Sequence, residues 1–462
     1  MNKNIKASSW YLVGNLFDKA IAFLTIPIFT RMLTTADYGI VNTYMSYVTI
    51  LAIILGLSME ASIQTAYFEF KNDIKTYIST IIIGAGSFSF IFSICIFVSI
   101  ILLSIEVDYV LVFLAILQGF MMYVLNVAKM YYMMRVKYIQ RVILMSGPHT
   151  LMAFFSVWGI ILCTNNKYMG MIIPYAVTMM LFGIVVLIYF WKKTECKLKK
   201  SYFKYAIKYS LPIVFHALSL QILAQFDKIM LTSLRNVAET GIYSLIYNVG
   251  LVSQVFTNAL DNAWLPWFQK KLHEGNKNKI INNNASKLMI IVAVIVLEIM
   301  MIAPEIIKIL SPKEYWQGIS MVIPIILATY IMFLYTLEVH TEYSYKRTKQ
   351  IPIYTMIAAS FKIILNFFFI PIYGAMGAAY ITLIAYLLSF GMHYNAAHKC
   401  NKEILSLPIF FIPTIMVLMG AIYLFFFQEN FLVRGIMFIF IGISFCVYAK
   451  KRKLLKTMFS DK

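Results

Sequence analysis

Charge, and negative charge above all, is scarce in this sequence. Of its 462 residues only 20 are Asp or Glu, against 40 Lys or Arg, and charged residues make up 13% of the chain. About 25% is usual in soluble globular domains, so this composition excludes an ordinary soluble fold. The hydrophobic residues, 61% of the chain, come in long blocks. Because about 20 apolar residues cross the hydrocarbon of a membrane, we predict an integral membrane protein.

Cysteines and catalytic motifs are also few. The five cysteines show no paired spacing, which argues against a disulfide framework or a metal site. The sequence has no GxxxxGK(S/T) phosphate loop, no GxSxG nucleophile elbow and no HExxH helix. We therefore expect no catalytic residues, no metal and no cofactor, and we predict a transporter and not an enzyme.

The apolar blocks predict an all-α polytopic membrane protein with about fourteen transmembrane helices. They lie near residues 10–32, 40–64, 77–104, 109–131, 143–163, 169–191, 209–233, 238–262, 287–310, 316–341, 353–371, 374–396, 407–427 and 431–449. If the N-terminus is cytoplasmic, most basic residues fall in inward-facing segments, and the outward loops hold Lys167, Arg235 and Lys313. By the positive-inside rule, we expect both termini on the cytoplasmic side.

The net charge of +20 raises nucleic acid as a partner. The basic residues are, however, spread over short loops at one predicted membrane face, with "KKTECKLKK" and "KKRKLLK" the densest segments. Anionic headgroups explain this distribution better, so we expect membrane lipids and no nucleic acid as partners.

A weak internal repeat divides the chain. Placing Lys6 to Gly39 over Lys208 to Gly241 sets "ADYGI" over "AETGI" at the same point of the topology. We predict an N-terminal six-helix lobe over 1–200, a second over 201–402, and a helix pair with a basic cytoplasmic tail over 403–462. Transporters built from parallel repeats place their substrate path between the halves, and we expect the same here.

Four segments stand out, namely "PIFTRMLTTADYGIVNTYMSY", "FDKIMLTSLRNVAETGIYSLIY", "AWLPWF" and "IPIYGAMGAAYIT". They resemble the bacterial oligosaccharide flippases, the polysaccharide exporters of the multidrug/oligosaccharidyl-lipid/polysaccharide superfamily. The resemblance implies a V-shaped, MATE-like pair of lobes in the bacterial cytoplasmic membrane. It also implies that the protein moves an isoprenyl (undecaprenyl)-diphosphate-linked oligosaccharide to the outer leaflet by alternating access, for O-antigen or capsule synthesis.

Basic residues inside the predicted helices are the candidate substrate-binding residues. A Lys or Arg at a helix centre costs about 2.5–3.5 kcal/mol on insertion scales, so such residues usually face a bundle interior or water. One interpretation is a cationic path that binds the diphosphate through charge-assisted hydrogen bonds. Its candidate residues are Lys19, Arg31, Lys228 and Lys362.

The alternative interpretation is that these bases form structural or gating salt bridges. The candidate partners are Asp18, Asp227, Glu60 and Glu298. Glu298 is also a candidate for coupling transport to an ion. Three acids near predicted inner helix ends are expected to be exposed to water, namely Glu60, Glu338 and Glu342. A structural role is expected for His149.

The leading hypothesis is a lipid-linked oligosaccharide flippase. A MATE-type drug/cation antiporter is the alternative, and intramembrane bases argue against it because they repel cations. A membrane enzyme of glycan polymerisation or ligation is disfavoured by the short outward loops, and a structural scaffold by the intramembrane charges. A polysaccharide polymerase and a chain-length regulator are expected partners. Coupling to protons, sodium or the membrane potential is left open by the sequence.

Overall fold

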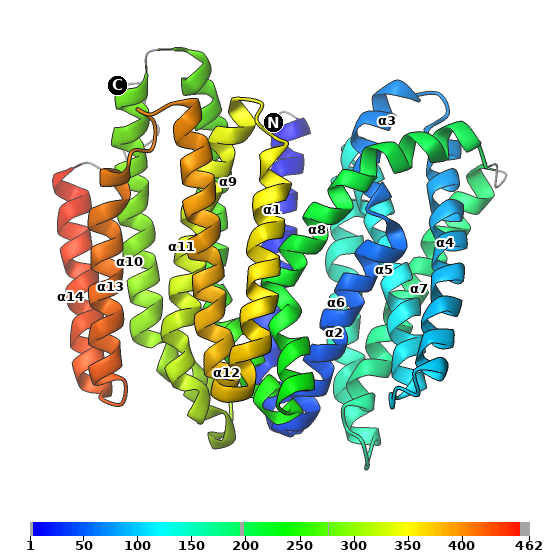
Figure 1. The fold of residues 1–462 in the computed structure, drawn as a ribbon, viewed down its shortest axis with the longest axis horizontal. Coiled ribbons are helices and arrows are strands. Elements are labelled where there is room, and N and C mark those ends of the chain that lie inside the picture. The colour runs from blue at the N-terminus through cyan, green and yellow to red at the C-terminus, as the bar shows by residue number, and fades with distance from the viewer. Residues whose placement is uncertain (1–2, 195–197, 276, 453–462) are drawn as a thin grey trace. The chain divides into compact units, whose positions relative to one another are not determined.

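The structure is a computed structural model that describes residues 3–194, 198–275 and 277–452. Over these residues it contains fourteen α-helices and two short 3₁₀ helices, and no strand (Figure 1). The prediction of an all-α fold is confirmed.

The helices follow one another with short connections. Their bounds are α1 (Lys3–Met32), α2 (Thr35–Gly56), η1 (Met59–Ser62), α3 (Ile63–Glu69), α4 (Ile74–Leu102), α5 (Tyr109–Met134), α6 (Tyr138–Leu162), α7 (Met169–Thr194), α8 (Lys200–Leu234), α9 (Val237–His273), α10 (Asn278–Leu310), η2 (Lys313–Met321), α11 (Val322–Ser344), α12 (Gln350–Cys400), α13 (Leu407–Phe427) and α14 (Phe431–Lys451).

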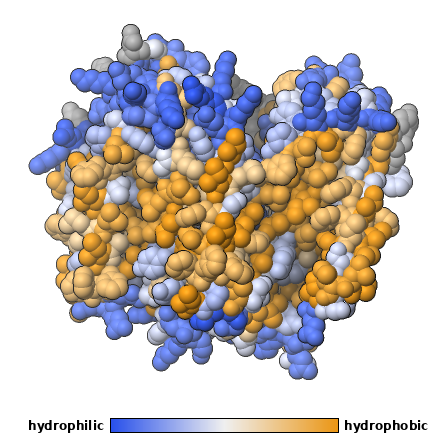
Figure 2. Space-filling model, in the orientation of Figure 1, coloured by the Kyte–Doolittle hydropathy of each residue, from blue (hydrophilic) through white to orange (hydrophobic). Residues whose placement is uncertain are grey.

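Eleven helices of the described chain are long and apolar enough to cross a membrane. α12 counts once among them although it contains two of the predicted spans, and the more polar α1 and α9 are not included. Large apolar side chains such as Leu102 and Phe426 are more than 70% exposed. Figure 2 shows an apolar band on the visible face of the protein, with polar residues at both of its ends. The protein is a multi-pass membrane protein.

The chain folds as two compact units, Met1–Thr232 and Ser233–Lys462. The first unit has an apolar core that joins η1, α3, α4, α5, α6, α7 and the start of α8, with buried residues such as Tyr77, Val124 and Ala206. In the second unit α11 is the most buried helix and packs against α9, α10, α12 and α13. The first unit includes residues 201–232, which the internal repeat assigns to the second lobe; the lobe boundary stays a prediction from sequence similarity.

Aromatic packing and an ion pair fix the start of α8 in the first unit. The Lys199 ammonium lies 2.5 Å from the Asp73 carboxylate, and the Tyr202 hydroxyl donates to the same carboxylate at 2.7 Å. The Lys199 hydrogen bond lowers the pKa of Asp73 to about 2. Phe70 stacks against Tyr77 and contacts the Tyr202 ring beside this pair. The first turns of α8 therefore belong to the first unit.

The two segments of α12 meet at Gly374, within the motif "IPIYGAMGAAYIT". Gly374 has φ 56° and ψ −140°, a conformation that L side chains rarely adopt. Glu239 of α9 supports this corner, because its Oε2 accepts the N–H of Ala375 at 3.2 Å. Arg235 donates to the Pro371 carbonyl at 3.2 Å on the other side of the corner. The glycine thus sits where one helix ends and the next begins.

One buried cation attaches α14 to the second unit. Within α14, which the structure describes in full, Arg434 is the one buried side chain. Its guanidinium makes a bidentate ion pair with Glu305 of α10 and donates to the Met301 carbonyl at 2.8 Å. Figure 1 shows α13 and α14 side by side next to α10. Because the rest of α14 is largely exposed, this charge-assisted contact is a main anchor of the helix.

We expect Gly374→Ala to lower the free energy of unfolding by about 1–3 kcal/mol, because the backbone conformation is strained for alanine. The new Cβ would also lie 2.5 Å from Oε2 of Glu239. Gly391→Ala in the same helix is the matched control, since nothing lies within 4 Å of its Cβ. Thermal unfolding of the detergent-purified proteins measures the difference. Equal stability of the Gly374 variant and the wild type would contradict the assigned role.

We expect Arg434→Met to destabilise the second unit by about 1.5–3 kcal/mol, because it removes hydrogen bonds to a charged partner and leaves Glu305 unpaired. A double variant, Arg434→Met with Glu305→Leu, removes both charges and should recover most of this loss. The rate of limited proteolysis between α13 and α14 is the measurement. A double variant as sensitive as the single one would show that the ion pair does not anchor α14.

Candidate functional site

The structure separates the two neighbouring charges of α1. Asp18 contacts His149 of α6, with Oδ1 and Nδ1 2.5 Å apart, and both side chains are partly accessible. Lys19 is exposed. Consecutive side chains of a helix point about 100° apart, so Asp18 and Lys19 face different surroundings. The hydrogen-bonded partner of Asp18 is thus His149 and not one of the candidate bases.

Lys129 of α5 joins this region and was missed by the sequence analysis. It interacts electrostatically with Asp18, Glu60 and Arg141. It lies inside α5, which extends beyond it to Met134. The signal that could have identified it is a lone lysine between apolar residues on both sides, as in "LNVAKMYYM".

Glu60 lies in η1 at the edge of the same region. Its Oε2 is buried and accepts no hydrogen bond within the described structure. Its side chain is half-buried, so the expectation of an acid freely exposed to water was wrong. Glu60 is therefore a charge partner for Lys129 and not a surface residue.

Asp227 and Lys228 are buried in α8, with 1% and 5% of their surfaces exposed. They attract each other electrostatically. The Thr43 hydroxyl of α2 lies 2.6 Å from that of Thr232 and 3.5 Å from the Lys228 carbonyl. Nε2 of Gln221, in the same helix, donates to the Thr49 hydroxyl of α2 at 2.7 Å. This part of α8 therefore packs on α2, and the first unit holds both charges.

Arg31, near the end of α1, is exposed, and its Nη1 donates to the Pro27 carbonyl at 2.9 Å. The second unit holds the two remaining candidates. Lys362 of α12 is 1% exposed. Glu298 of α10 faces α14, since a Cβ on Gly442 would lie 3.3 Å from its Oε1.

The candidates therefore divide between the units. The first unit holds Asp18, Lys19, Arg31, Glu60, Asp227 and Lys228, and the second holds Glu298 and Lys362. Among the described residues, no three His, Cys, Asp or Glu side chains gather in a way that could hold a metal ion. The chemistry offered by the first unit is that of several cations with acids nearby.

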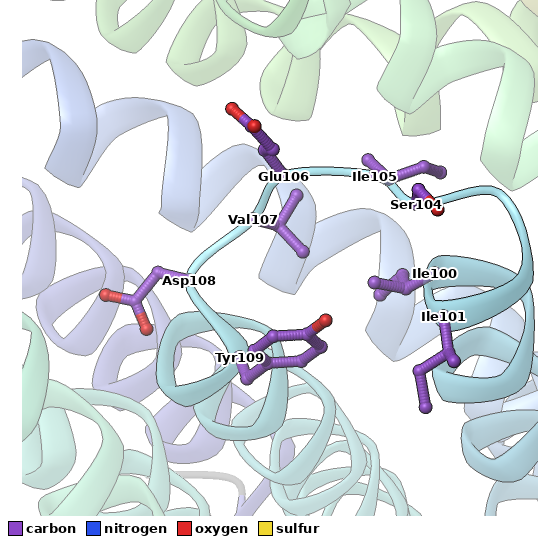
Figure 3. A pocket seen from close by; sticks show the side chains of 8 residues that line it. All are labelled: Ile100, Ile101, Ser104, Ile105, Glu106, Val107, Asp108 and Tyr109. Atoms are coloured by element: carbon purple, nitrogen blue, oxygen red, sulfur yellow. The ribbon is translucent and has the colours of Figure 1, made fainter.

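A pocket of about 750 Å³ lies at the turn between α4 and α5 and is lined by residues 100–101 and 104–109 (Figure 3). Its charged residues are Glu106 and Asp108, and Asp108 accepts the Val110 N–H at 2.8 Å as the cap of α5. Since the lining carries acids and no base, it does not suit an anionic substrate.

Comparisons with known proteins agree on the kind of molecule. Residues 5–272 match the family model described as polysaccharide biosynthesis protein. A relative from Haemophilus influenzae, described as an uncharacterized membrane protein, is 22% identical over 403 residues, which cover 83% of this chain and 92% of the relative.

Two solved transporters are similar in fold. The lipid II flippase MurJ in an inward closed conformation has a TM-score of 0.74 at 14% identity, covering 95% of this chain and 98% of that chain. An inward-facing multidrug resistance MATE family transporter of the MOP superfamily has a TM-score of 0.56 at 12% identity, covering 83% and 96%. The resemblance noted in the sequence is confirmed at the level of family and fold.

We expect Asp18 and His149 to be energetically coupled. In a double-mutant cycle with Asp18→Asn and His149→Gln, the coupling free energy should be about 0.2–1 kcal/mol, because the pair is partly accessible to solvent. Thermal unfolding of the four purified proteins at one pH measures it. Strictly additive effects of the two substitutions would show that the contact contributes nothing to stability.

Proposed function

The chain belongs to the polysaccharide biosynthesis protein family, and from this we propose that it is a flippase for a lipid-diphosphate-linked oligosaccharide. The lipid is an isoprenyl chain such as undecaprenol, and the movement is from the inner to the outer leaflet of the bacterial cytoplasmic membrane. The product feeds O-antigen, capsule or a related surface polysaccharide. A polymerase and a chain-length regulator of that pathway are the proposed protein partners.

The burial of Lys228 within a membrane-spanning helix is the observation that carries this proposal. A lysine is expensive to insert into a membrane, so one that persists there is held by opposite charge or serves a ligand. Lys228 has Asp227 beside it, and Lys19 of the same unit is exposed within α1. A diphosphate carries the charge and the acceptor oxygens that both lysines can bind. We assign Lys19 and Lys228 to the diphosphate, with Arg31 and Lys362 as further cations.

The acids of the first unit suit a charge exchange during transport. Without substrate, Asp18 and Glu60 compensate Lys129. When a diphosphate enters, it replaces the carboxylates as the counter-charge, so the ion pairs separate without leaving a cation alone in low dielectric. Asp18, Glu60 and Asp227 are therefore proposed as gating partners.

Membrane orientation follows from the distribution of Lys and Arg, and we propose that both termini are cytoplasmic. An inside-negative potential contributes about 2.3 kcal/mol per elementary charge per 100 mV, and it favours outward movement of an anion. The potential therefore favours the proposed direction of transport.

Both solved transporters named above share the fold, so fold alone does not separate a flippase from a drug antiporter. The bases of the described helices distinguish the two functions. A site for cationic drugs would be weakened by Lys19 and Lys228, because like charges repel. In the proposed flippase, the same two lysines attract the diphosphate of the substrate.

We expect Lys19→Met and Lys228→Met each to weaken binding of undecaprenyl diphosphate roughly 10- to 100-fold, the loss of a hydrogen bond to a charged group. Binding is measured on the full-length protein in nanodiscs, with undecaprenyl monophosphate as the competing lipid. Lys313→Met, an exposed lysine at the start of η2, is the matched control. Surface polysaccharide in cells that carry each variant should fall in the same order, at equal amounts of membrane-inserted protein.

Two results would overturn this function. Wild-type affinity and normal surface polysaccharide in both lysine variants would remove the site assignment. Binding of a cationic dye such as ethidium, with no binding of the diphosphate lipid, would identify a drug antiporter instead.

A further inference from the structure

Two acids lie one turn apart on α11, the most buried helix of the second unit. Glu338 and Glu342 are 2% and 0% exposed. The expectation that they are exposed to water near an inner helix end was therefore wrong. Residues i and i+4 of a helix lie on the same face, so the two carboxyl groups are close enough to repel when both are ionised.

A histidine from the neighbouring helix completes the cluster. His393 of α12 places Nδ1 2.6 Å from Oε1 of Glu342, and neither side chain has any exposed surface. The imidazole stacks on Tyr335 at 5.7 Å and meets the Tyr354 ring edge-on at 5.4 Å. The aromatic rings hold the histidine in one orientation toward Glu342.

Each member of the cluster has a polar atom that is buried and has no hydrogen-bond partner in the described structure. These atoms are Oε1 of Glu338, Oε2 of Glu342 and Nε2 of His393. Buried polar groups are nearly always paired, because an unpaired one costs about 1–3 kcal/mol. Three such atoms in one buried cluster therefore indicate hydrogen-bonding capacity that the described protein groups do not use.

Titratable groups near this cluster come from α11 itself and from the segments packed on it. Glu342 interacts electrostatically with Tyr343 and Cys400, and Glu338 with Tyr394. Arg347, after the end of α11, acts on Cys400. Among the other elements packed on α11, α9 carries Asp261, which is paired with His340 at 2.8 Å, and α13 has no charged residue. The charged residues of α10 are Lys279, Lys287, Glu298, Glu305 and Lys308, and those of η2 are Lys313 and Glu314.

We propose that Glu338, Glu342 and His393 form a proton-binding site that is loaded and unloaded during the transport cycle. When His393 is protonated, it forms a neutral pair with the Glu342 carboxylate, and Glu338 decides the charge of the cluster. A proton taken from water onto the Glu338 carboxylate makes the cluster neutral, and its return to water restores one negative charge. Each cycle of loading and release thus moves one proton and one unit of charge.

A proton fits this cluster better than a metal ion. No group of three His, Cys, Asp or Glu side chains in the described residues has the geometry for a metal, this cluster included. Protonation instead removes the cost of burying a charged carboxylate, and with it the repulsion between Glu338 and Glu342. The coupling role rests on the proposed function, whereas proton binding itself is independent of the substrate.

The test uses the full-length protein in nanodiscs without any lipid-linked sugar. Infrared difference spectra across a pH titration report the C=O band of protonated carboxyl groups, and a pH indicator counts the protons taken up. We expect Glu338→Gln to lose a C=O band and to take up about one proton fewer per molecule than the wild type. Glu314→Gln, an exposed acid of η2 in the same unit, is the matched control and should keep the band.

Glu338→Asp guards against a variant that fails to fold, because it keeps a carboxyl group and should shift the band without removing it. His393→Gln should change the pH at which the band appears, since it removes the partner of Glu342. Unchanged spectra and proton uptake in all three variants would overturn the proposal. Loss of proton uptake when sodium chloride replaces choline chloride would show a monovalent-cation site and would also overturn it. Binding of undecaprenyl diphosphate, measured separately on the same samples, shows whether the flippase assignment stands or fails on its own.

Discussion

The cost of a bare charge in hydrocarbon is the constraint on which the rest of this structure depends. An ionised side chain at membrane depth must have an opposite charge, hydrogen bonds or access to water. Arg434 meets this requirement with Glu305, and Asp18 meets it with His149. Each of these pairs joins two helices that are far apart in sequence. The charges that are hardest to insert therefore also determine which helices pack together.

Buried backbone polar groups carry a similar cost, and this explains the contacts at the Gly374 corner. A helix that ends inside a compact unit leaves backbone groups without partners. Glu239 accepts one of the freed N–H groups, and Arg235 donates to one of the freed carbonyls. Glu239 also belongs to the segment "AETGI", which the internal repeat sets over "ADYGI". In the first unit the matching Asp37 instead closes a capping box with Thr34, so the repeated acid serves a helix end in both units by different contacts.

The sequence was sufficient for the number and type of the helices and insufficient for their charge partners. Apolar blocks of about 20 residues report the spans directly, because length and hydropathy are local properties of the chain. The partner of Asp18 lies 131 residues away in α6, and no local pattern identifies it. Glu338 and Glu342 were misjudged for a related reason. Distance from a helix end predicts exposure only where no other helix covers that end, and α12 covers this one with His393.

The two proposed binding sites lie in different units. In the proposal, Lys19 and Lys228 of the first unit bind the anionic substrate, and the buried acids Glu338 and Glu342 of the second unit bind a proton. If the two ligands favour different conformations, each changes the affinity for the other by the same factor, because linkage is reciprocal. A coupling of 1.4 kcal/mol corresponds to a tenfold change in affinity. Such linkage does not require the two sites to be in contact, because a helix that connects the units can respond to both ligands. α8 is the helix that connects them. Its start and its buried Lys228 are held in the first unit, and its last residues belong to the second.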